Sequence, residues 1–447
     1  MPPDSPSAPQ PIDQLVDARW IVPVEPAGTV LEHHSLAIHD GRILALLPTD
    51  AARKHFVPRQ HIALSDHLLM PGFVNLHTHA AMTLLRGYAD DMALMRWLQE
   101  RIWPAESRHV STDFVRDGTL LACWEMLRGG ITCFNDMYFF PAAAAEAALS
   151  AGIRAALGIT VFEFPSAYGS DAEDYLAKGL ATRDALRDES LISFCLAPHA
   201  PYTVADKTFE RVAMLAGQLD LPIHIHVHET GDEIAGSLKE HGVRPLERLR
   251  RLGLLGPGLI AVHAVHLEAA EIDLLAKHGC HVAHCPTSNM KLASGLAPVG
   301  QMLERGIGIG LGSDGAASNN RLDLMQEMRH AALLAKLDSG DASCLPAHQA
   351  LRMATLDGAR ALGLDGQIGS LQPGKSADLC ALNLGDWSLQ PCFDPVSHLV
   401  YTAGREQITH VWVAGKLRIK DTNPVDSMVP DLIRSTVLWQ NALSNKH

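Results

Sequence analysis

The stretch that decides the fold is Leu69-Met70-Pro71-Gly72-Phe73-Val74-Asn75-Leu76-His77-Thr78-His79. Its apolar run predicts a buried strand that ends in two histidines. Side chains two residues apart point to the same face of a strand, so His77 and His79 converge on one point, as a pair of metal ligands must. Two histidines this close also occur by chance or in solvated loops, so the pair alone does not establish a metal site.

Seven further apolar runs follow, each ending in a polar residue and separated from the next by a helical stretch. They cover residues 130–136, 154–160, 191–199, 221–229, 259–263, 281–284 and 307–314. Strand–helix alternation repeated eight times predicts a parallel sheet that closes into a TIM-type (β/α)8 barrel, an α/β fold. An open, doubly wound sheet is the rival fold, but no Gly-rich phosphate loop follows the first strand.

The two ends of the chain have a β-like pattern instead. The Asp40-Gly41 turn separates two runs in which apolar and polar residues alternate. Residues 377–382 and 408–417, near the C-terminus, show the same strand-like pattern. Neither end has enough strands for a stable sheet core, so we expect the two ends to meet. The predicted units are a disordered tail over 1–13, a composite β-sandwich domain of 14–68 plus 368–447 with a C-terminal helix from about Asp431, and a barrel over 69–367.

Composition excludes several classes of protein. The 447 residues are 47% hydrophobic and 19% charged, which is typical of a soluble globular chain. A net charge of −13 without a basic cluster argues against nucleic acid as a partner. The sequence shows no signal peptide and no uncharged apolar stretch long enough to span a membrane, so we expect a cytoplasmic protein. The eight cysteines form no CxxC pair, which argues against structural zinc ribbons and against the PCxxC design of zinc deaminases.

Candidate ligands lie at the predicted strand ends, where (β/α)8 barrels place their catalytic groups. The fifth strand carries His224, His226 and His228 on one face. Three histidines of one strand cannot all bind one ion, and the spacing favours His226, with the others packed or hydrogen-bonded. Glu229 follows and could lean over the metal as an acid or a base. The eighth strand ends in Asp314, which as a single residue is more often a helix cap than a ligand.

Together these residues resemble a known family. His77-x-His79, His226, His263 and Asp314 are similar to the amidohydrolase superfamily pattern in order and in strand position. Longer motifs look like those of the methylthioadenosine/S-adenosylhomocysteine deaminases, and the resemblance covers nearly the whole chain. These motifs are residues 81–87, 198–202, 226–230, 284–292 and 312–320.

The resemblance implies metal-dependent hydrolytic deamination of an adenine nucleoside to the inosine-type product and ammonia. It implies that four residues hold one divalent ion, Zn²⁺ in the first instance and Fe²⁺ as the alternative. These residues are His77, His79, His226 and Asp314. Dinuclear relatives carry a lysine on the fourth strand, whereas this chain has His199 there, so we expect a single ion.

The resemblance also implies a role for each remaining site residue. Asp314 would take a proton as hydroxide attacks C6, and Glu229 would protonate N1 and assist the departure of ammonia. His263 would hydrogen-bond the nucleophile, with His266 as the alternative. His199 would contact the purine or ribose. Glu106 would bind the ribose hydroxyls, although it could also be a carboxylate that stabilises a helix N-terminus.

One departure from the family concerns the 5′ substituent. Members that accept S-adenosylhomocysteine place arginines in and after the third strand, whereas residues 158–163 contain none. Arg183 or Arg187 could substitute for them. The sequence therefore favours a neutral 5′ substituent, as in 5′-methylthioadenosine or adenosine, and leaves S-adenosylhomocysteine open.

Three alternatives to a nucleoside deaminase stay open at this point: a guanine deaminase, a triazine chlorohydrolase, or a barrel that serves as a non-catalytic scaffold. The complete ligand set argues against the scaffold. Ribose recognition by Glu106 would separate nucleoside deamination from the two remaining reactions. We expect a small-molecule nucleoside as the partner and a homo-oligomer, either a dimer or a tetramer.

Overall fold

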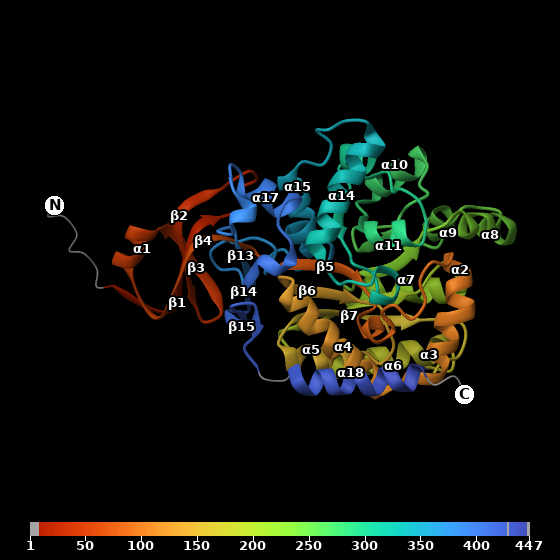
Figure 1. The fold of residues 1–447 in the computed structure, drawn as a ribbon. Helices are drawn as coiled ribbons and strands as arrows, with labels where there is room; N and C mark the ends of the chain where they lie inside the picture. Colours follow the sequence, from red (N-terminus) through yellow and green to blue (C-terminus); the bar gives the residue numbers. More distant parts are fainter. Residues whose placement is uncertain (1–8, 427–428, 445–447) are drawn as a thin grey trace.

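The computed structural model describes residues 9–426 and 429–444. Its strands form two eight-stranded sheets. One is the parallel barrel, and the other is a separate sheet built from both ends of the chain, which lies to one side of the barrel (Figure 1). The predicted fold class, a TIM-type barrel with a small β domain from the chain ends, is confirmed.

Every apolar run predicted as a barrel strand forms one, and neighbouring strands in the sheet are consecutive in the chain. The barrel closes where the last strand meets the first, since Asp314 N donates to His77 O at 3.0 Å. The barrel strands are β5 (Phe73–Thr78), β6 (Ile131–Asp136), β7 (Arg154–Val161), β8 (Ile192–Pro198), β9 (Ile223–Val227), β10 (Leu259–His263), β11 (His281–His284) and β12 (Gly308–Leu311).

Helices surround the barrel and bury their apolar faces against it. The helix α4 shows the local rules: Ser111 Oγ accepts from Phe114 N at 3.2 Å as its N-cap, and Gly130, just past its C-terminus, adopts the left-handed conformation with φ 84°. The helices between and after the barrel strands are α2 (Leu94–Trp97), α3 (Trp103–His109), α4 (Thr112–Arg128), α5 (Pro141–Ala151), α6 (Ala172–Ala185), α7 (Asp206–Leu219), α8 (Gly231–His241), α9 (Pro245–Arg251), α10 (Ala269–His278), α11 (Pro286–Lys291), α12 (Val299–Glu304), α13 (Ala316–Asn319), α14 (Leu324–Ser339), α15 (Ala347–Arg352) and α16 (Gly358–Ala361). Shorter helical turns are η1 (Ala80–Leu85), η2 (Leu98–Ile102) and η3 (Met353–Asp357).

The β domain joins the two chain ends through β4 and β13, which pair antiparallel with Met70 opposite Cys380. Its strands follow the single order β16-β15-β14-β13-β4-β1-β2-β3. Their bounds are β1 (Gln10–Ile21), β2 (Leu31–His39), β3 (Arg42–Pro48), β4 (Phe56–Pro71), β13 (Leu379–Asn383), β14 (Ile408–Val413), β15 (Lys416–Lys420) and β16 (Asn423–Pro424). The remaining helical elements are α1 (Thr49–His55), η4 (Trp387–Leu389), α17 (Pro395–Tyr401), η5 (Arg405–Gln407) and α18 (Val429–Ser444).

Three boundaries differ from those we predict. Strand β1 begins at Gln10, inside the segment 1–13 expected to be a tail, of which residues 1–8 lie outside the described part. The stretch 69–79 is divided at Gly72: β4 ends in the β domain and β5 begins the barrel. A Cβ on Gly72 would lie 2.2 Å from the Thr132 side chain, so only glycine allows this passage.

The third difference is the position of the C-terminal helix. Helix α18 packs along α4, at the lower edge of the view in Figure 1, rather than on the β domain. Trp439 Nε1 donates to Asp117 Oδ2 at 3.0 Å, and its ring meets Phe114 edge-on at a centroid distance of 5.2 Å. Helix α18 therefore adds a layer to the barrel domain.

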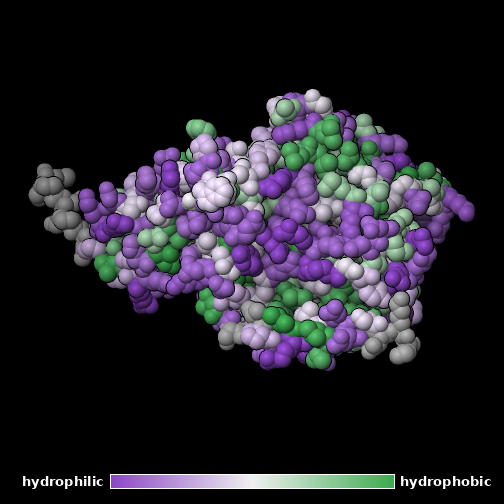
Figure 2. All heavy atoms as spheres, in the orientation of Figure 1, coloured by the Kyte–Doolittle hydropathy of each residue, from purple (hydrophilic) through white to green (hydrophobic). Residues whose placement is uncertain are grey.

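The visible surface is largely hydrophilic, with smaller apolar areas between the polar ones (Figure 2). Among the described residues, every helix is too short or too polar to cross a membrane.

A buried ion pair holds the barrel against the β domain and gives the first prediction. Arg154 Nε, at the start of β7, lies 3.1 Å from Asp378 Oδ2, and both side chains are nearly inaccessible to solvent. Arg154→Met leaves the Asp378 carboxylate buried without its cation, so the free energy of unfolding should fall by about 3–5 kcal/mol. Urea denaturation measures this loss.

Two further variants test whether the unpaired charge is the cause. Adding Asp378→Asn to Arg154→Met removes the charge and should restore part of the loss. Arg183→Met removes a surface arginine that pairs with Asp184 and should change stability by less than about 0.5 kcal/mol. An Arg154→Met protein as stable as the wild type would contradict the prediction.

Candidate metal centre and active site

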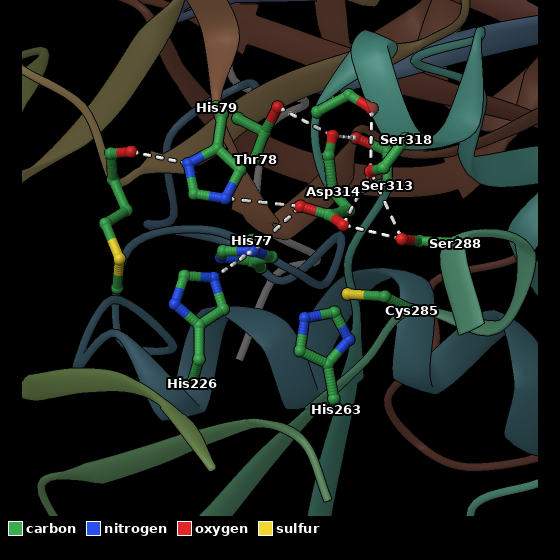
Figure 3. A network of polar contacts seen from close by, with 12 residues as sticks. His77, Thr78, His79, His226, His263, Cys285, Ser288, Ser313, Asp314 and Ser318 are labelled. Atoms are coloured by element: carbon green, nitrogen blue, oxygen red, sulfur yellow. Dashed lines mark hydrogen bonds and ion pairs between the residues drawn. The ribbon is translucent and has the colours of Figure 1, made fainter. Parts of the chain in front are cut away.

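Three histidines and one aspartate meet at the carboxyl end of the barrel. His77 Nε2 lies 3.2 Å from Asp314 Oδ1 and 3.3 Å from His226 Nε2. His79 Nε2 lies 3.3 Å from the same Asp314 oxygen. Figure 3 shows the three rings and the carboxylate turned toward one another. These groups come from β5 and the residue directly after it, from β9 and from the segment after β12, so the closed barrel brings together residues that are far apart in the sequence.

In each of the three histidines, the ring nitrogen that faces away from the cluster makes a hydrogen bond. This arrangement fixes the orientation and tautomer of a ligating imidazole and leaves its other nitrogen for a metal. The contacts are His77 Nδ1 to His224 Nε2 at 2.9 Å, His79 Nδ1 to Met137 O at 2.6 Å, and His226 Nδ1 to His199 O at 2.8 Å. His224 therefore lies behind the ligand position, and the expectation that His226 alone of its strand points into the site fits this geometry.

Asp314 is oriented by two serines that the sequence reasoning missed. Its Oδ2 accepts from Ser288 Oγ at 2.6 Å and from Ser318 Oγ at 2.7 Å, while Oδ1 faces the histidines. Burial favours the neutral carboxyl, but hydrogen bonds from His77 and His79, together with the positive charge of His79, outweigh it and hold the pKa of Asp314 well below its usual range. Both serines lie in family-like motifs, but serine is too common to have been singled out.

The four groups fit a divalent ion. Burial lowers the pKa of His77 to about 4 and holds that of His226 well below its usual range, so these rings are neutral, as ligands must be. The ligand atoms of His77, His79 and His226 lie within 4.8 Å of one another, as do those of His77, His263 and Asp314. Imidazole nitrogens and carboxylate oxygens are donors that zinc binds in proteins, and a catalytic site also keeps a position open for water.

Glu229 and His263 lie beside this cluster. Glu229 is only 7% exposed, and its Oε2 lies 3.8 Å from His263 Nε2. Burial raises the pKa of Glu229, and the nearby His263 only partly offsets the effect. His263 Nδ1 lies 2.8 Å from Asn289 Oδ1, a second partner that sequence reasoning did not identify. His266 contacts Ser294 O at 2.7 Å and does not line the cavity, so the structure brings His263 rather than His266 to the site.

A cavity of about 500 Å³ opens above the cluster and contains the predicted substrate-binding residues. Glu106 accepts a hydrogen bond from the Tyr138 hydroxyl at 2.6 Å, and burial raises the Glu106 pKa to about 7 although this bond opposes the shift. His199 contacts Thr203 Oγ1 at 3.0 Å, and burial lowers its pKa to about 3. Tyr138 carried no sequence signal, because a lone tyrosine after an apolar strand is common in ordinary protein cores.

The fold and the site define the class: a (β/α)8-barrel protein with a candidate metal centre at the carboxyl end of the barrel. Comparison with known proteins then identifies the family. The profile of the amidohydrolase family matches residues 68–418. The chain belongs to the amidohydrolase family, as its motifs predict.

Within this family the chain is similar to named deaminases over almost its whole length. It is 46% identical to the 5-methylthioadenosine/S-adenosylhomocysteine deaminase of Teredinibacter turnerae, covering 97% of this chain and 98% of that protein. The crystal structure of an adenosine deaminase from Xanthomonas campestris with bound zinc has a TM-score of 0.96 and 48% identity, covering 97% of this chain and 99% of that one.

The enzymes that represent two of the alternative functions are more distant. An atrazine chlorohydrolase from Arthrobacter aurescens is 23% identical with a TM-score of 0.88, covering 96% of this chain and 100% of that one. A guanine deaminase from C. acetobutylicum is 22% identical with a TM-score of 0.79, covering 90% and 99%. At this level of identity they share the fold with this chain, and no activity follows from the similarity.

The close contact between β12 and β5 gives a prediction for Gly312. A Cβ at this position would lie 2.8 Å from His77 Cβ and 2.9 Å from Cys285 Sγ. Gly312→Ala should therefore cost about 1–3 kcal/mol of unfolding free energy through overpacking and displace His77. Thermal or urea denaturation measures the stability, and metal content after dialysis reports the state of His77.

Gly217→Ala provides a matched control in α7, where a Cβ meets no atom within 4 Å. Alanine is favoured over glycine inside a helix, so this variant should keep or slightly raise stability. A Gly312→Ala protein that equals the wild type in both stability and metal content would show that the two strands leave room for a methyl group between them.

Proposed function

We propose that this chain catalyses metal-dependent hydrolytic deamination of an adenine nucleoside, yielding the inosine-type product and ammonia. The observation that carries the proposal is the meeting, in one cavity, of the candidate metal ligands with the buried carboxylate Glu229. Sequence identity of 46–48% to named deaminases over nearly the full chain supports the choice of reaction and substrate class.

One divalent ion, zinc in the first instance, would be held by His77, His79, His226 and Asp314. This donor set and the zinc bound in the Xanthomonas campestris structure support that assignment. When bound, the ion would acidify a water molecule and so supply a nucleophile at neutral pH. The fourth barrel strand has no lysine that could bridge a second ion, which favours a single one.

The protein groups would move the protons. Replacing the C6 amino group requires a C–O bond to form, the C–N bond to break, and protons to reach N1 and the departing nitrogen. Glu229, whose pKa is raised by burial, would hold a proton for N1. Asp314 would accept the proton of the attacking water, and His263 would hydrogen-bond the oxygen as it attacks.

Glu106 and His199 would orient the nucleoside. Glu106 lines the cavity on α3 and is fixed by the Tyr138 hydroxyl, so its free oxygen can meet the ribose hydroxyls. His199 lies between the cluster and the aromatic wall of the cavity, 4.9 Å from His226 and 4.6 Å from Phe162 between ring centroids. Its neutral ring can stack on or hydrogen-bond the purine.

Glu229→Gln tests the reaction and the proton donor together. The amide keeps the shape of the side chain but holds no acidic proton, so kcat should fall by about 10²–10⁴-fold. The measurement is ammonia release from zinc-loaded protein with 5′-methylthioadenosine and adenosine, with guanine and melamine as compounds that lack ribose. Metal content should equal that of the wild type.

Asp232→Asn is the matched control, because Asp232 is an exposed carboxylate in the first turn of α8. It should keep wild-type turnover. Wild-type protein that releases ammonia from neither nucleoside would refute the proposed function. Full activity in Glu229→Gln, or loss of its metal, would refute the role given to Glu229.

Ser288→Ala tests the support of Asp314. Without the 2.6 Å hydrogen bond, the carboxylate is less well oriented, and metal affinity should fall by about 10–100-fold. Competition with a chromophoric chelator measures the affinity. Ser237→Ala is the control, since Ser237 in α8 is also buried but donates to Val243 O, beyond the end of that helix. Equal affinities of Ser288→Ala and wild type would contradict the role of Ser288.

A further inference from the structure

The chain turns sharply between β9 and α8, and this turn carries Glu229. Strand β9 ends at Val227, and His228 adopts the left-handed conformation with φ 59°. That conformation is unfavourable for a residue other than glycine, so the surrounding structure must hold the turn in place. Glu229 follows and enters the cavity, where its Oε2 lies 3.8 Å from His263 Nε2. The position of Glu229 therefore depends on this turn.

The side chain of Glu233 binds the backbone of the turn. Its Oε1 accepts from His228 N at 2.9 Å, and its Oε2 accepts from Glu229 N at 2.8 Å. Glu233 lies in the first turn of α8, where Thr230 is the N-cap and its Oγ1 accepts from Glu233 N at 3.3 Å. Both carboxylate oxygens of the buried Glu233 are thus bonded to the two residues that make the turn.

Another helix of the barrel shows the ordinary form of this arrangement. At α10, Glu271 Oε2 accepts from Glu268 N at 2.9 Å, so the third helical residue bonds the N-cap residue itself. At α8 the side chain of Glu233 reaches further back, to the two residues that precede the N-cap. One of them is Glu229, the proposed proton donor. Capping a helix does not require this longer reach.

The peptide group that joins His228 to Glu229 is held at both of its ends. Its N–H donates to the carboxylate in α8. Its carbonyl, His228 O, accepts from Val265 N and from His266 N, each at 3.0 Å. Both donors lie just after β10, the strand that ends in His263. The turn that carries Glu229 is therefore bonded to the segment that follows His263.

The ring of His228 holds the same turn from outside the cavity. It is fully buried, its Nε2 accepts from Leu246 N at 3.0 Å, and its Nδ1 lies 3.1 Å from His266 O. His228 does not line the cavity. The third histidine of this strand region is thus part of the support of the turn.

We propose that Glu233 is a positioning residue of the proposed deaminase. Its carboxylate holds the backbone of Glu229, so that the side chain of Glu229 meets N1 of the purine in the geometry that proton transfer requires. Glu233 lies outside the lining of the cavity and acts through Glu229. This inference rests on the proposed function and adds to it a residue that does not touch the substrate.

Glu233→Gln removes half of this support. An amide has one acceptor oxygen, and its NH2 group would face the second backbone N–H, so the peptide group must move. A displacement of about 1 Å at a catalytic group costs about 100-fold in rate, and we expect kcat to fall by about 10–100-fold. KM and metal content should not change, because Glu233 lies outside the cavity lining. The measurement is the kinetics of ammonia release from 5′-methylthioadenosine by zinc-loaded, full-length protein.

A double-mutant cycle distinguishes positioning from a general loosening of the fold. A Glu229→Gln protein lacks the acidic proton that Glu233 would help to place. Adding Glu233→Gln to it should therefore change kcat by less than about twofold. A role in stability alone would lower kcat by the same factor with Glu229 and with glutamine at that position.

Asp323→Asn is the matched control for the change from carboxylate to amide. Asp323 is also buried, and its Oδ1 accepts from Met325 N at 3.1 Å and from Gln326 N at 3.2 Å at the start of α14. This variant should keep the wild-type kcat.

Glu233→Asp provides a second variant. It keeps the charge and both acceptor oxygens but withdraws them by one methylene, so kcat should again fall when Glu229 is present and not in the Glu229→Gln protein. This cycle decides the question if Glu233→Gln does not fold.

The outcomes separate the two proposals. Wild-type kcat in Glu233→Gln, or an equal loss in both backgrounds of the cycle, would overturn the role of Glu233 and leave deamination intact. Loss of metal from Glu233→Gln would also overturn it, because the effect would then act through the candidate ligands. Wild-type protein that releases ammonia from none of the nucleosides would refute the deaminase and, with it, the positioning role.

Discussion

The closure of β12 on β5 is the constraint on which the site depends. Asp314 N donates to His77 O at 3.0 Å, and Thr78 Oγ1 donates to Asp314 O at 3.1 Å. Closer to the barrel interior, Asn75 and Ser313 exchange hydrogen bonds of 2.7 and 2.9 Å. These bonds hold the histidines of the first strand against the carboxylate that follows the last strand. An open sheet would keep both ligand sets and never bring them together.

Burying this carboxylate among the histidines lowers the stability of the fold unless a cation neutralises its charge. Asp314 is buried and ionised, and burial keeps His77 and His226 neutral. His79 alone offsets part of the carboxylate charge. Burial lowers the pKa of His79, but its hydrogen bond to Asp314 outweighs this effect and raises that pKa to about 9. A divalent ion held by His77, His79, His226 and Asp314 would replace that proton with a stronger positive charge. The hydrogen bonds behind each ring then satisfy the remaining nitrogens. The same groups that would destabilise an empty core are those that a metal needs.

Much of the fold could be predicted because the sequence repeats one local pattern eight times. Apolar runs that end in polar residues marked every barrel strand and placed His77, His79, His226 and Asp314 at one rim. The break at Gly72 was not predictable, because the last residues of β4 and the first residues of β5 are all apolar and buried, so the pattern does not change between the sheets. The packing of α18 on α4 was missed for a related reason: an amphipathic pattern shows that a face is buried but not against what. Ser288 and Tyr138 were missed because their role depends on a partner far away in the chain.

The two ends of the cavity therefore differ in how they can be predicted. At the metal end, histidine and aspartate recur at fixed strand positions, a combination that ordinary packing rarely produces, so motif and chemistry agree. At the mouth, Trp103, Phe162 and Phe164 come from a helix and a loop that resemble ordinary core segments, and only their ring contacts reveal a common wall. In the proposed deaminase, the residues at the metal end would supply the reaction, whereas residues of the mouth would contact the parts of the substrate that lie away from the ion. Sequence identity to relatives consequently supports the proposed reaction more directly than a particular substrate, because motifs identify the residues of the rim, whereas only contacts in the folded chain identify those of the mouth.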